Sequence, residues 1–219
     1  MIKTVIFDID NTLYDYDVAH RAAFSAVSAY ASEAFGWDTE VFAEKHSRMQ
    51  RTLCERMEEG SVIHNRLIRY QNLLEKEGLP LYPHAVRMTQ IYWQTLLGYA
   101  VVTPGAATVL GKLKDQGFRI GIGTDMTAYI QFRKLEQLGL LSYIDFVVTS
   151  EEAQAEKPSE KFFALCLEKA GCPAENCLFV GDHRQKDVEG ARAAGMQARW
   201  FLPGKTEFVK LLQDLWERD

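Results

Sequence analysis

The feature that most constrains the fold is a short apolar segment near the N-terminus that ends in two acids. Residues 2–7 are apolar except for Lys3 and Thr4, which is typical of a buried strand in a parallel sheet. The segment ends at Asp8, and Asp10 follows two residues later. In an open α/β sheet, ligands bind at the carboxyl ends of the strands, so we expect Asp8 to lie where the chemistry is done. Two carboxylates this close repel each other, and both stay ionised only if a metal, a lysine or a helix N-terminus lies near them.

The composition of the 219-residue chain is that of a globular protein with a sizeable core. Hydrophobic residues make up 47% and charged residues 25%, and the net charge is −5. This balance argues against a general nucleic-acid binder, but a local cation or metal still permits a phosphorylated substrate. The sequence shows neither a secretory leader nor a run of about 18 apolar residues. We therefore expect a cytoplasmic monomer or homodimer that binds no nucleic acid polymer and no membrane.

The cysteines are Cys54, Cys166, Cys172 and Cys177, and they contain no C-x-x-C pair. A chain of this length does not need disulfides for stability, so we predict free thiols in a reducing compartment. The alternative is that Cys172 and Cys177 form a disulfide or half of a metal site.

Residues 17–98 are predicted to be an all-helical insertion. Apolar residues recur there at helical spacing, as at Ile63, Leu67, Tyr70 and Leu74. Turn signals divide the segment into about four helices. The expected N-caps are Asp38 and Ser61, and the expected helix terminators are Gly36, Gly60 and Gly78.

Beyond residue 101, strand-like and helical segments alternate. Strands are expected at 118–122, 146–149, 177–180 and 197–201, and helices at 104–116, 127–138, 158–170, 187–194 and from about 206. This alternation predicts a mainly parallel, doubly wound α/β sheet with right-handed crossovers. Because the first strand joins the same sheet, we predict an α/β core at 1–16 and 99–219 with a helical domain inserted at 17–98.

The later strands also end in residues suited to phosphate chemistry. Thr124 can donate a hydroxyl hydrogen bond beside a helix N-terminus that can bind an anion. Lys157 precedes Pro158 on the loop after the third strand and could hold its ammonium over Asp8 and a phosphate. Asp182 ends the fourth strand, and Mg²⁺ prefers one or two such carboxylates together with phosphate oxygen and water.

Each of these residues also has an ordinary structural explanation. Thr124 or Asp125 could cap the following helix, and Lys157 could be solvated. Asp182 could be a turn residue, and Asp187 an N-cap. Convergence of the side chains in space separates the two interpretations.

The order of these motifs resembles that of the haloacid dehalogenase (HAD) superfamily of phosphotransferases. The matching residues are Phe7-Asp8-Ile9-Asp10-Asn11-Thr12-Leu13, Thr124, Lys157-Pro158, and Gly181-Asp182 through Asp187. The resemblance covers the whole chain, and the helical insertion is similar to the mobile cap of the superfamily's first cap class.

The resemblance implies a Mg²⁺-dependent phosphomonoester hydrolase that works through an aspartyl-phosphate. Asp8 would be the nucleophile and a metal ligand. Asp10 would be the general acid and then the base, with its backbone carbonyl on the metal. Thr124 and Lys157 would hold the phosphoryl group, and Asp182 would bind Mg²⁺.

Three nearby positions need separate treatment. The resemblance implies that Asp187 orients a metal-bound water or Lys157. Asp125 stands where the family usually has asparagine; it is a candidate substrate-binding residue, but we expect its carboxylate to turn toward the helix start because a negative charge facing phosphate weakens binding. His183 replaces a small hydroxyl residue, and we expect a partly exposed loop histidine more than a substrate contact.

Substrate choice is expected to come from the cap. Tyr16 and His20, just past the first motif, are candidate substrate contacts, although each also fits an ordinary helix position. The Asp-Asn-Thr-Leu variant looks similar to the nucleotidase-like branch, so we expect a small phosphorylated metabolite, with a nucleoside monophosphate as one candidate. Asp10 argues against dehalogenation, because a halide leaving group needs no proton.

Two rival functions stay open at this point. A sugar-phosphate mutase would return the phosphate to a sugar instead of releasing it to water. A non-enzymatic phospho-accepting module also uses an aspartate, Mg²⁺, a hydroxyl residue and a lysine, but it needs only about half this length and has no helical insertion.

Overall fold

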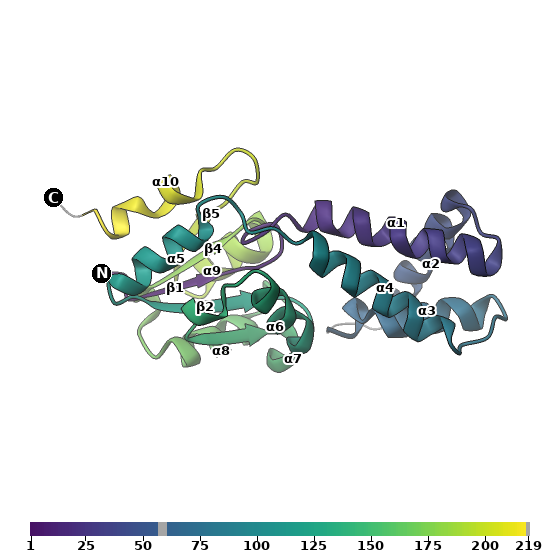
Figure 1. The fold of residues 1–219 in the computed structure, drawn as a ribbon. Coiled ribbons are helices and arrows are strands. Elements are labelled where there is room, and N and C mark those ends of the chain that lie inside the picture. The colour runs from purple at the N-terminus through teal and green to yellow at the C-terminus, as the bar shows by residue number, and fades with distance from the viewer. Residues whose placement is uncertain (57–60, 218–219) are drawn as a thin grey trace. The chain divides into compact units, whose positions relative to one another are not determined.

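The computed structural model describes residues 1–56 and 61–217 and divides the chain into two units (Figure 1). One unit joins residues 1–16 to 101–219, and the other spans residues 17–100. The second boundary lies two residues beyond the one expected from the sequence. The expected terminator Gly60 lies outside the described residues.

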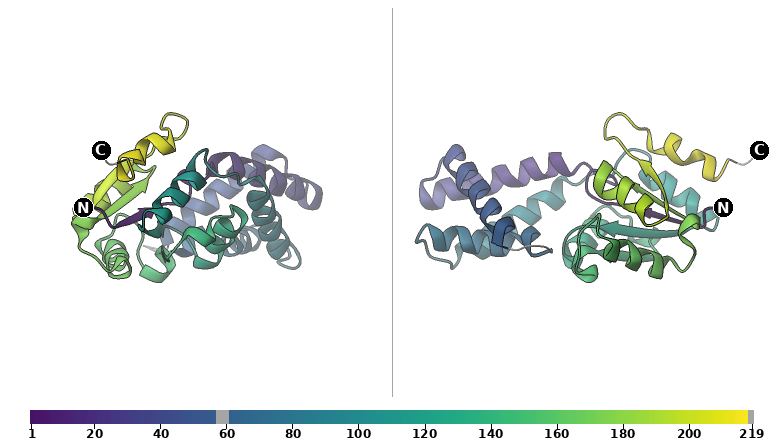
Figure 2. Two further views of the ribbon diagram at one scale, coloured as in Figure 1. Left: turned by 60° about the vertical axis from the view of Figure 1, so that its left-hand side comes forward. Right: turned by 180° about the vertical axis from the view of Figure 1, so that it is seen from behind.

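Parallel strands form the sheet of the first unit (Figures 1 and 2). The strands are β1 (Thr4–Phe7), β2 (Arg119–Thr124), β3 (Phe146–Thr149), β4 (Cys177–Gly181) and β5 (Gln197–Trp200). Their order is β3-β2-β1-β4-β5, and every pairing is parallel. The predicted α/β class with a parallel sheet is therefore confirmed. Because Phe7 pairs with Ile122 on one side and Val180 on the other, the residues that follow β1, β2 and β4 emerge at one edge.

Helices cover both faces of this sheet. The helices of the first unit are α5 (Ala106–Asp115), α6 (Ala128–Gln137), α7 (Ser150–Ala153), α8 (Glu160–Ala170), α9 (Gly190–Ala193) and α10 (Phe208–Leu212). Neighbouring residues of a strand point to opposite faces. Ile6 accordingly packs in a buried cluster with Phe163 of α8, whereas Phe7 stacks on Phe208 of α10 with ring centroids 5.9 Å apart.

The helix expected at 187–194 begins differently. A π-helical segment covers Arg184–Glu189 and leads into α9. The N-cap is His183, whose Nδ1 accepts a hydrogen bond from the Lys186 backbone N–H at 3.2 Å. The interpretation of Asp187 as an N-cap is therefore wrong. Single π-turns occur often at functional sites, and this one places Asp187 in the interior behind the end of β4, 1% exposed.

The second unit consists of helices, as the sequence predicts. These are α1 (Tyr16–Phe35), which starts at the last residue of the first unit, α2 (Thr39–Arg56), α3 (Arg66–Lys76) and α4 (His84–Tyr99), with a 3₁₀ turn at Ser61–His64. Asp38 accepts a hydrogen bond from the Val41 backbone N–H at 2.8 Å, which confirms it as the cap of α2. Ser61 is not the cap of α3, because that helix begins later and is capped by the Asn65 side chain. In the described residues, no helix is long and apolar enough to cross a membrane.

All four cysteines are free thiols, as predicted. The Sγ atoms of Cys172 and Cys177 lie 3.4 Å apart, in contact but well beyond the bond length of a disulfide, about 2.05 Å. The alternative of a Cys172–Cys177 disulfide is therefore not found.

A buried histidine gives the helical unit a predicted pH dependence. The His46 ring of α2 packs against the rings of Phe24 and Tyr70, with centroids 5.3 and 6.2 Å away. Burial, reinforced by the charge of Arg69, lowers the pKa of His46 to about 3. The unfolded chain binds this proton near pH 6.5, so the free energy of unfolding should fall by about 2 kcal/mol between pH 7 and pH 5.

Urea denaturation of the wild type and of His46→Phe at both pH values tests this prediction. The substitution keeps an aromatic ring in the cluster and removes the titrating group. We expect the variant to lose about 2 kcal/mol less than the wild type on acidification, because other titrating groups contribute equally to both proteins. Identical losses in the two proteins would contradict the prediction.

Candidate active site

A buried lysine joins two of the acids predicted from the sequence. The Lys157 Nζ donates to the Oδ1 atoms of Asp8 and Asp187 at 2.9 and 2.7 Å. It also donates to the Gly123 carbonyl, at the end of β2, at 3.3 Å. Asp8 and Lys157 are 6% and 4% exposed, so this ion pair is shielded from water. The lysine thus reaches the end of β1 from the loop before α8.

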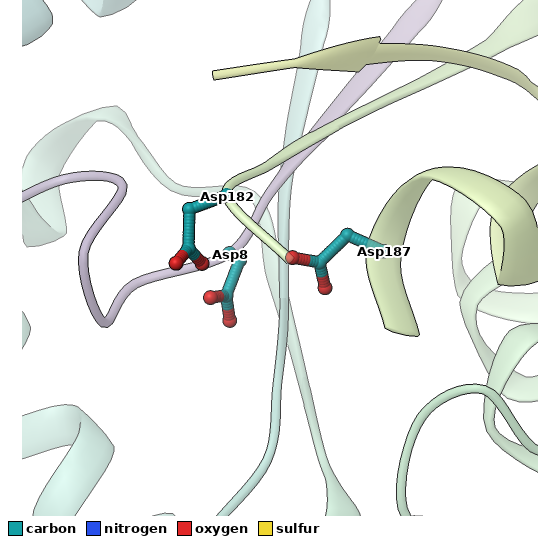
Figure 3. A group of neighbouring side chains, drawn as sticks. All are labelled: Asp8, Asp182 and Asp187. Atoms are coloured by element: carbon teal, nitrogen blue, oxygen red, sulfur yellow. The ribbon is translucent and has the colours of Figure 1, made fainter. Parts of the chain in front are cut away.

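Three carboxylates meet around this lysine. Asp8, Asp182 and Asp187 each place one oxygen within 4.8 Å of the others, and Figure 3 shows them gathered at the strand ends. Both oxygens of Asp187 are already bound, Oδ1 by Lys157 and Oδ2 by the His183 backbone N–H at 2.8 Å. Asp8 and Asp182 are therefore the better placed of the three to face a cation. Carboxylate oxygens are hard donors of the type that Mg²⁺ prefers, so the donor set fits that ion.

The electrostatics of the cluster show an excess of negative charge. Burial raises the pKa of Asp8, Lys157 opposes the rise and the neighbouring acids add to it, with the result that this pKa is about 8. Burial, together with Asp187, raises the pKa of Asp182 to about 6. Burial alone would lower the pKa of Lys157, but Asp187 and Asp8 hold it well above its usual value. The lysine stays charged, and the carboxylates around it are under-neutralised.

The cluster opens into a small cavity of about 170 Å³. Five carboxylates and two lysines line it, together with Asn11, Thr124 and His183. This volume suits a phosphoryl group and an ion, because whole-metabolite pockets are typically about 300–1,000 Å³. The lining is too acidic to attract phosphate by itself, so a divalent cation at the carboxylates would reverse the local balance.

Asp10 is held by a lysine that the sequence reasoning missed. The Lys134 Nζ, fully buried on α6, donates to the Asp10 Oδ1 and Oδ2 atoms at 2.6 and 2.8 Å, and the Tyr14 hydroxyl donates to Oδ1 at 2.5 Å. Burial alone would raise the pKa of Asp10, but Lys134 and Tyr14 hold it below its usual value. A helical pattern could have indicated this lysine, because it shares the buried face of α6 with Leu135 and Leu138.

Thr124 is anchored by a second residue of the same helix. Its hydroxyl oxygen accepts a hydrogen bond from the Gln131 Nε2 at 2.7 Å, and the same amide donates to the Asp125 carbonyl at 2.8 Å. Thr124 lies at the cavity wall and is 1% exposed. Gln131 was also missed from the sequence, although it lies one turn before Lys134 on the same buried face.

Asp125 does not turn toward the helix start, so that expectation is wrong. Its Oδ1 accepts from the Lys157 backbone N–H at 3.0 Å, and its Oδ2 accepts from the Lys186 Nζ at 2.9 Å. The first N–H of α6, that of Ala128, is bound instead by the Glu151 carboxylate at 2.8 Å. The unforeseen Lys186, in the π-helical segment, offsets the negative charge that Asp125 brings to the cavity.

The remaining residues predicted from the sequence are Tyr16, His20 and His183, and they do not all lie at the cavity. The Tyr16 ring lies 5.6 Å from the Lys134 Nζ and so stands beside Asp10. His20 belongs to the helical unit, where its Nδ1 lies 2.7 Å from the Tyr92 hydroxyl. His183 is exposed on its loop, as expected, and lines the cavity.

Comparison with known families decides what kind of protein carries this site. A family model for haloacid dehalogenase-like hydrolases matches residues 2–195. The chain belongs to this family. The resemblance inferred from the four motifs is thereby confirmed over almost the whole chain.

Named relatives of this hydrolase are phosphatases of small molecules. A ribulose-1,5-bisphosphate 5-phosphatase of Halopiger xanaduensis is 35% identical, over 94% of this chain and 87% of its own length. A glyceraldehyde 3-phosphate phosphatase of Methanopyrus kandleri is 33% identical, over 98% and 90%. A pyrimidine 5′-nucleotidase of Streptococcus pneumoniae is 27% identical, over 94% and 86%.

A solved structure shows the same fold. The HAD-hydrolase YfnB of Bacillus subtilis, a crystal structure bound to magnesium, superposes with a TM-score of 0.74 at 22% identity and covers 98% of both chains. The likeness confirms the predicted architecture, a HAD-type α/β core with a helical insertion.

Proposed function

We propose that this hydrolase releases phosphate from a small phosphorylated metabolite in two steps, through an aspartyl-phosphate on Asp8. The relatives confirm the predicted enzyme class, a phosphatase of the HAD family. The observation that carries the mechanism is the buried Asp8 carboxylate, fixed by Lys157 at the wall of a cavity sized for a phosphoryl group.

In the first step, an Asp8 carboxylate oxygen attacks phosphorus, and the bond between phosphorus and the ester oxygen breaks. Asp10 gives its proton to that ester oxygen, so an alcohol leaves and the phosphate stays on Asp8. In the second step, water attacks the same phosphorus, Asp10 takes the proton of the water, and the bond to Asp8 breaks. The cycle ends with inorganic phosphate, a free Asp8 carboxylate and a protonated Asp10, which is the form that the first step requires.

The remaining site residues are assigned to holding the phosphoryl group. The Thr124 hydroxyl accepts a hydrogen bond from Gln131 at 2.7 Å and donates a long one to the Asp125 carbonyl at 3.4 Å, and we assign its proton to a phosphate oxygen when substrate enters the cavity. The Lys157 ammonium offers a positive charge beside Asp8. Asp187 holds Lys157 in place and is therefore a positioning residue. The Asp125 carboxylate accepts hydrogen bonds from the Lys157 backbone N–H and the Lys186 ammonium. We therefore assign Asp125 a positioning role in substrate binding, like that of Asp187.

The carboxylates of Asp8 and Asp182, with the backbone carbonyl of Asp10, are the proposed ligands of Mg²⁺. When bound, this ion would neutralise phosphate oxygens and the developing charge of phosphoryl transfer. The acid-rich lining described above is the feature of this structure that calls for such a cation.

The cavity is too small for a whole metabolite, so other residues must contact the rest of the substrate. We assign this part to Tyr16, the last residue of the first unit, and to residues of the helical unit at 17–100. His20 is the candidate within that unit. The two relatives named for sugar phosphates are 35% and 33% identical to this chain, and the nucleotidase is 27% identical. Sugar phosphates are therefore the first substrates to test, and nucleoside monophosphates the second.

A panel of phosphomonoesters assayed with Mg²⁺ and with EDTA tests the proposal. We expect phosphate release that depends on Mg²⁺, with one mole of phosphate formed per mole of ester consumed. Phosphate returned to a sugar hydroxyl would favour the mutase instead. A long-lived phosphoprotein without turnover would favour the phospho-accepting module, and no reaction with any ester would contradict all enzymatic alternatives.

A further inference from the structure

We propose that Lys134 is the residue that positions Asp10 for proton transfer, an inference that rests on the proposed function. The lysine is 0% exposed, and its ammonium bridges both carboxylate oxygens of Asp10 at 2.6 and 2.8 Å. The ammonium also lies 3.8 Å from the Met126 Sδ and 5.7 and 5.6 Å from the ring centroids of Tyr14 and Tyr16. Nearly all the hydrogen-bonding capacity of this buried cation is therefore directed at one acid.

The fold itself does not require a charge at this position. Residue 134 lies on the buried face of α6 with Leu135 and Leu138, where an apolar side chain would pack without a desolvation cost. Burying an ammonium is expensive even when it is paired, and such pairs are often no more stabilising than apolar residues of the same volume. The lysine is better explained by what it does to Asp10.

Tyr14 completes the arrangement around the two oxygens of Asp10. The Oδ1 atom accepts hydrogen bonds from the Tyr14 hydroxyl at 2.5 Å and from Lys134 at 2.6 Å, and Oδ2 accepts one from Lys134 at 2.8 Å. Hydrogen bonds to both oxygens fix the rotation of this carboxylate. The geometry therefore supports a positioning role for Lys134, with Tyr14 as its partner.

The same helix also holds the phosphate-binding side of the site. Gln131, one turn before Lys134, fixes the Thr124 hydroxyl at 2.7 Å. One rigid element thus sets the position of a phosphate ligand and of the proton donor together. Gln131 also lowers the pKa of Asp10 through a side-chain hydrogen bond, although less than Lys134 does, so α6 supports Asp10 through both residues.

Leaving-group dependence is the readout that a merely structural role would not change. We compare the wild type with Lys134→Met, using p-nitrophenyl phosphate and an alkyl phosphate at saturating Mg²⁺. The nitrophenolate leaves without a proton, whereas an alkoxide needs one, so only the alkyl ester reports on Asp10. Because general acid catalysis contributes about 10²–10⁴-fold, we expect kcat/KM for the alkyl ester to fall by roughly 10–100-fold more than for the nitrophenyl ester.

Four further variants make the comparison specific. Asp10→Asn should show the same selective loss, and Asp10→Asn combined with Lys134→Met should lose no more than Asp10→Asn alone, because both changes remove one interaction. Arg133→Met removes an exposed cation from the preceding residue of α6 and should leave the hydrolysis of both esters unaffected. Tyr14→Phe keeps the ring and removes one donor to Oδ1, so it should lower kcat/KM for the alkyl ester selectively, but by less than Lys134→Met does. This variant also tests the inference if Lys134→Met does not fold.

The outcomes separate this inference from the proposed function. Equal losses on both esters in Lys134→Met and Tyr14→Phe, or additive losses in the double variant, would overturn the role of Lys134 while the wild type stays a phosphatase. A wild type that hydrolyses neither ester with Mg²⁺ would overturn the proposed function, and the role of Lys134 with it.

Discussion

Replacing Asp8 by asparagine is expected to reduce phosphate release by roughly 10⁴-fold or more, the scale seen when a catalytic nucleophile is removed. An amide cannot form the acyl-phosphate bond on which both steps depend. The fold should survive the change, because burial already raises the pKa of Asp8 to about 8 and a neutral side chain of the same shape suits this environment. The measurement is phosphate release with Mg²⁺, together with thermal unfolding to show that the variant is folded.

A matched control removes an acid outside the site. Asp115→Asn changes an exposed carboxylate at the end of α5 and should keep full activity. Mass spectrometry of reactions quenched in acid should find phosphate on Asp8 in the wild type and none on residue 8 of the variant. An Asp8→Asn protein that retains activity within about tenfold of the wild type would rule out covalent catalysis by this residue.

The residues that follow strands could be predicted from the sequence for a physical reason. A buried parallel strand is a nearly continuous apolar run, and the first polar residue after it is fixed at the carboxyl edge of the sheet. Asp8 and Asp182 are therefore readable directly from the chain, and the structure places them together. Predicting Lys157 as a site residue required the order of the motifs as well, because no periodic pattern distinguishes a functional lysine in a loop from a solvated one.

The residues that were missed lie on helices or in partnerships that no local pattern encodes. Lys134 resembles a surface lysine unless its phase relative to Leu135 and Leu138 is considered, and its partner Asp10 lies 124 positions away. Asp125 was expected to interact locally, with the helix that follows it. It is held instead by Lys186, whose position depends on a π-helical turn that helical periodicity does not predict.

Replacing Lys157 by methionine should lower both activity and stability. Loss of one cation at the phosphoryl group is expected to reduce kcat by about 10²–10³-fold. Without the ammonium, Asp8 and Asp187 become two buried acids with no shared counter-charge, which should cost about 3–5 kcal/mol of folding free energy at neutral pH. The control is Lys210→Met, because Lys210 pairs with the exposed Glu207 and such a surface pair is worth about 0–1 kcal/mol.

The pH dependence of that loss identifies its cause. Removing Lys157 takes away a cation that opposes the rise in the pKa of Asp8, so in the folded variant this pKa should lie above the value of about 8 that it has in the wild type. A group with a raised pKa in the folded state contributes its stability at low pH and loses it as the pH rises through that pKa. Below about pH 8 both folded proteins hold this proton, so in urea denaturation with EDTA the deficit of the variant should grow as the pH rises above 8 and shrink as it falls back. Added Mg²⁺ should restore part of the difference at about pH 9, because it would face the same acids. A deficit that neither acid nor Mg²⁺ reduces would point to lost packing, since only an electrostatic deficit responds to both.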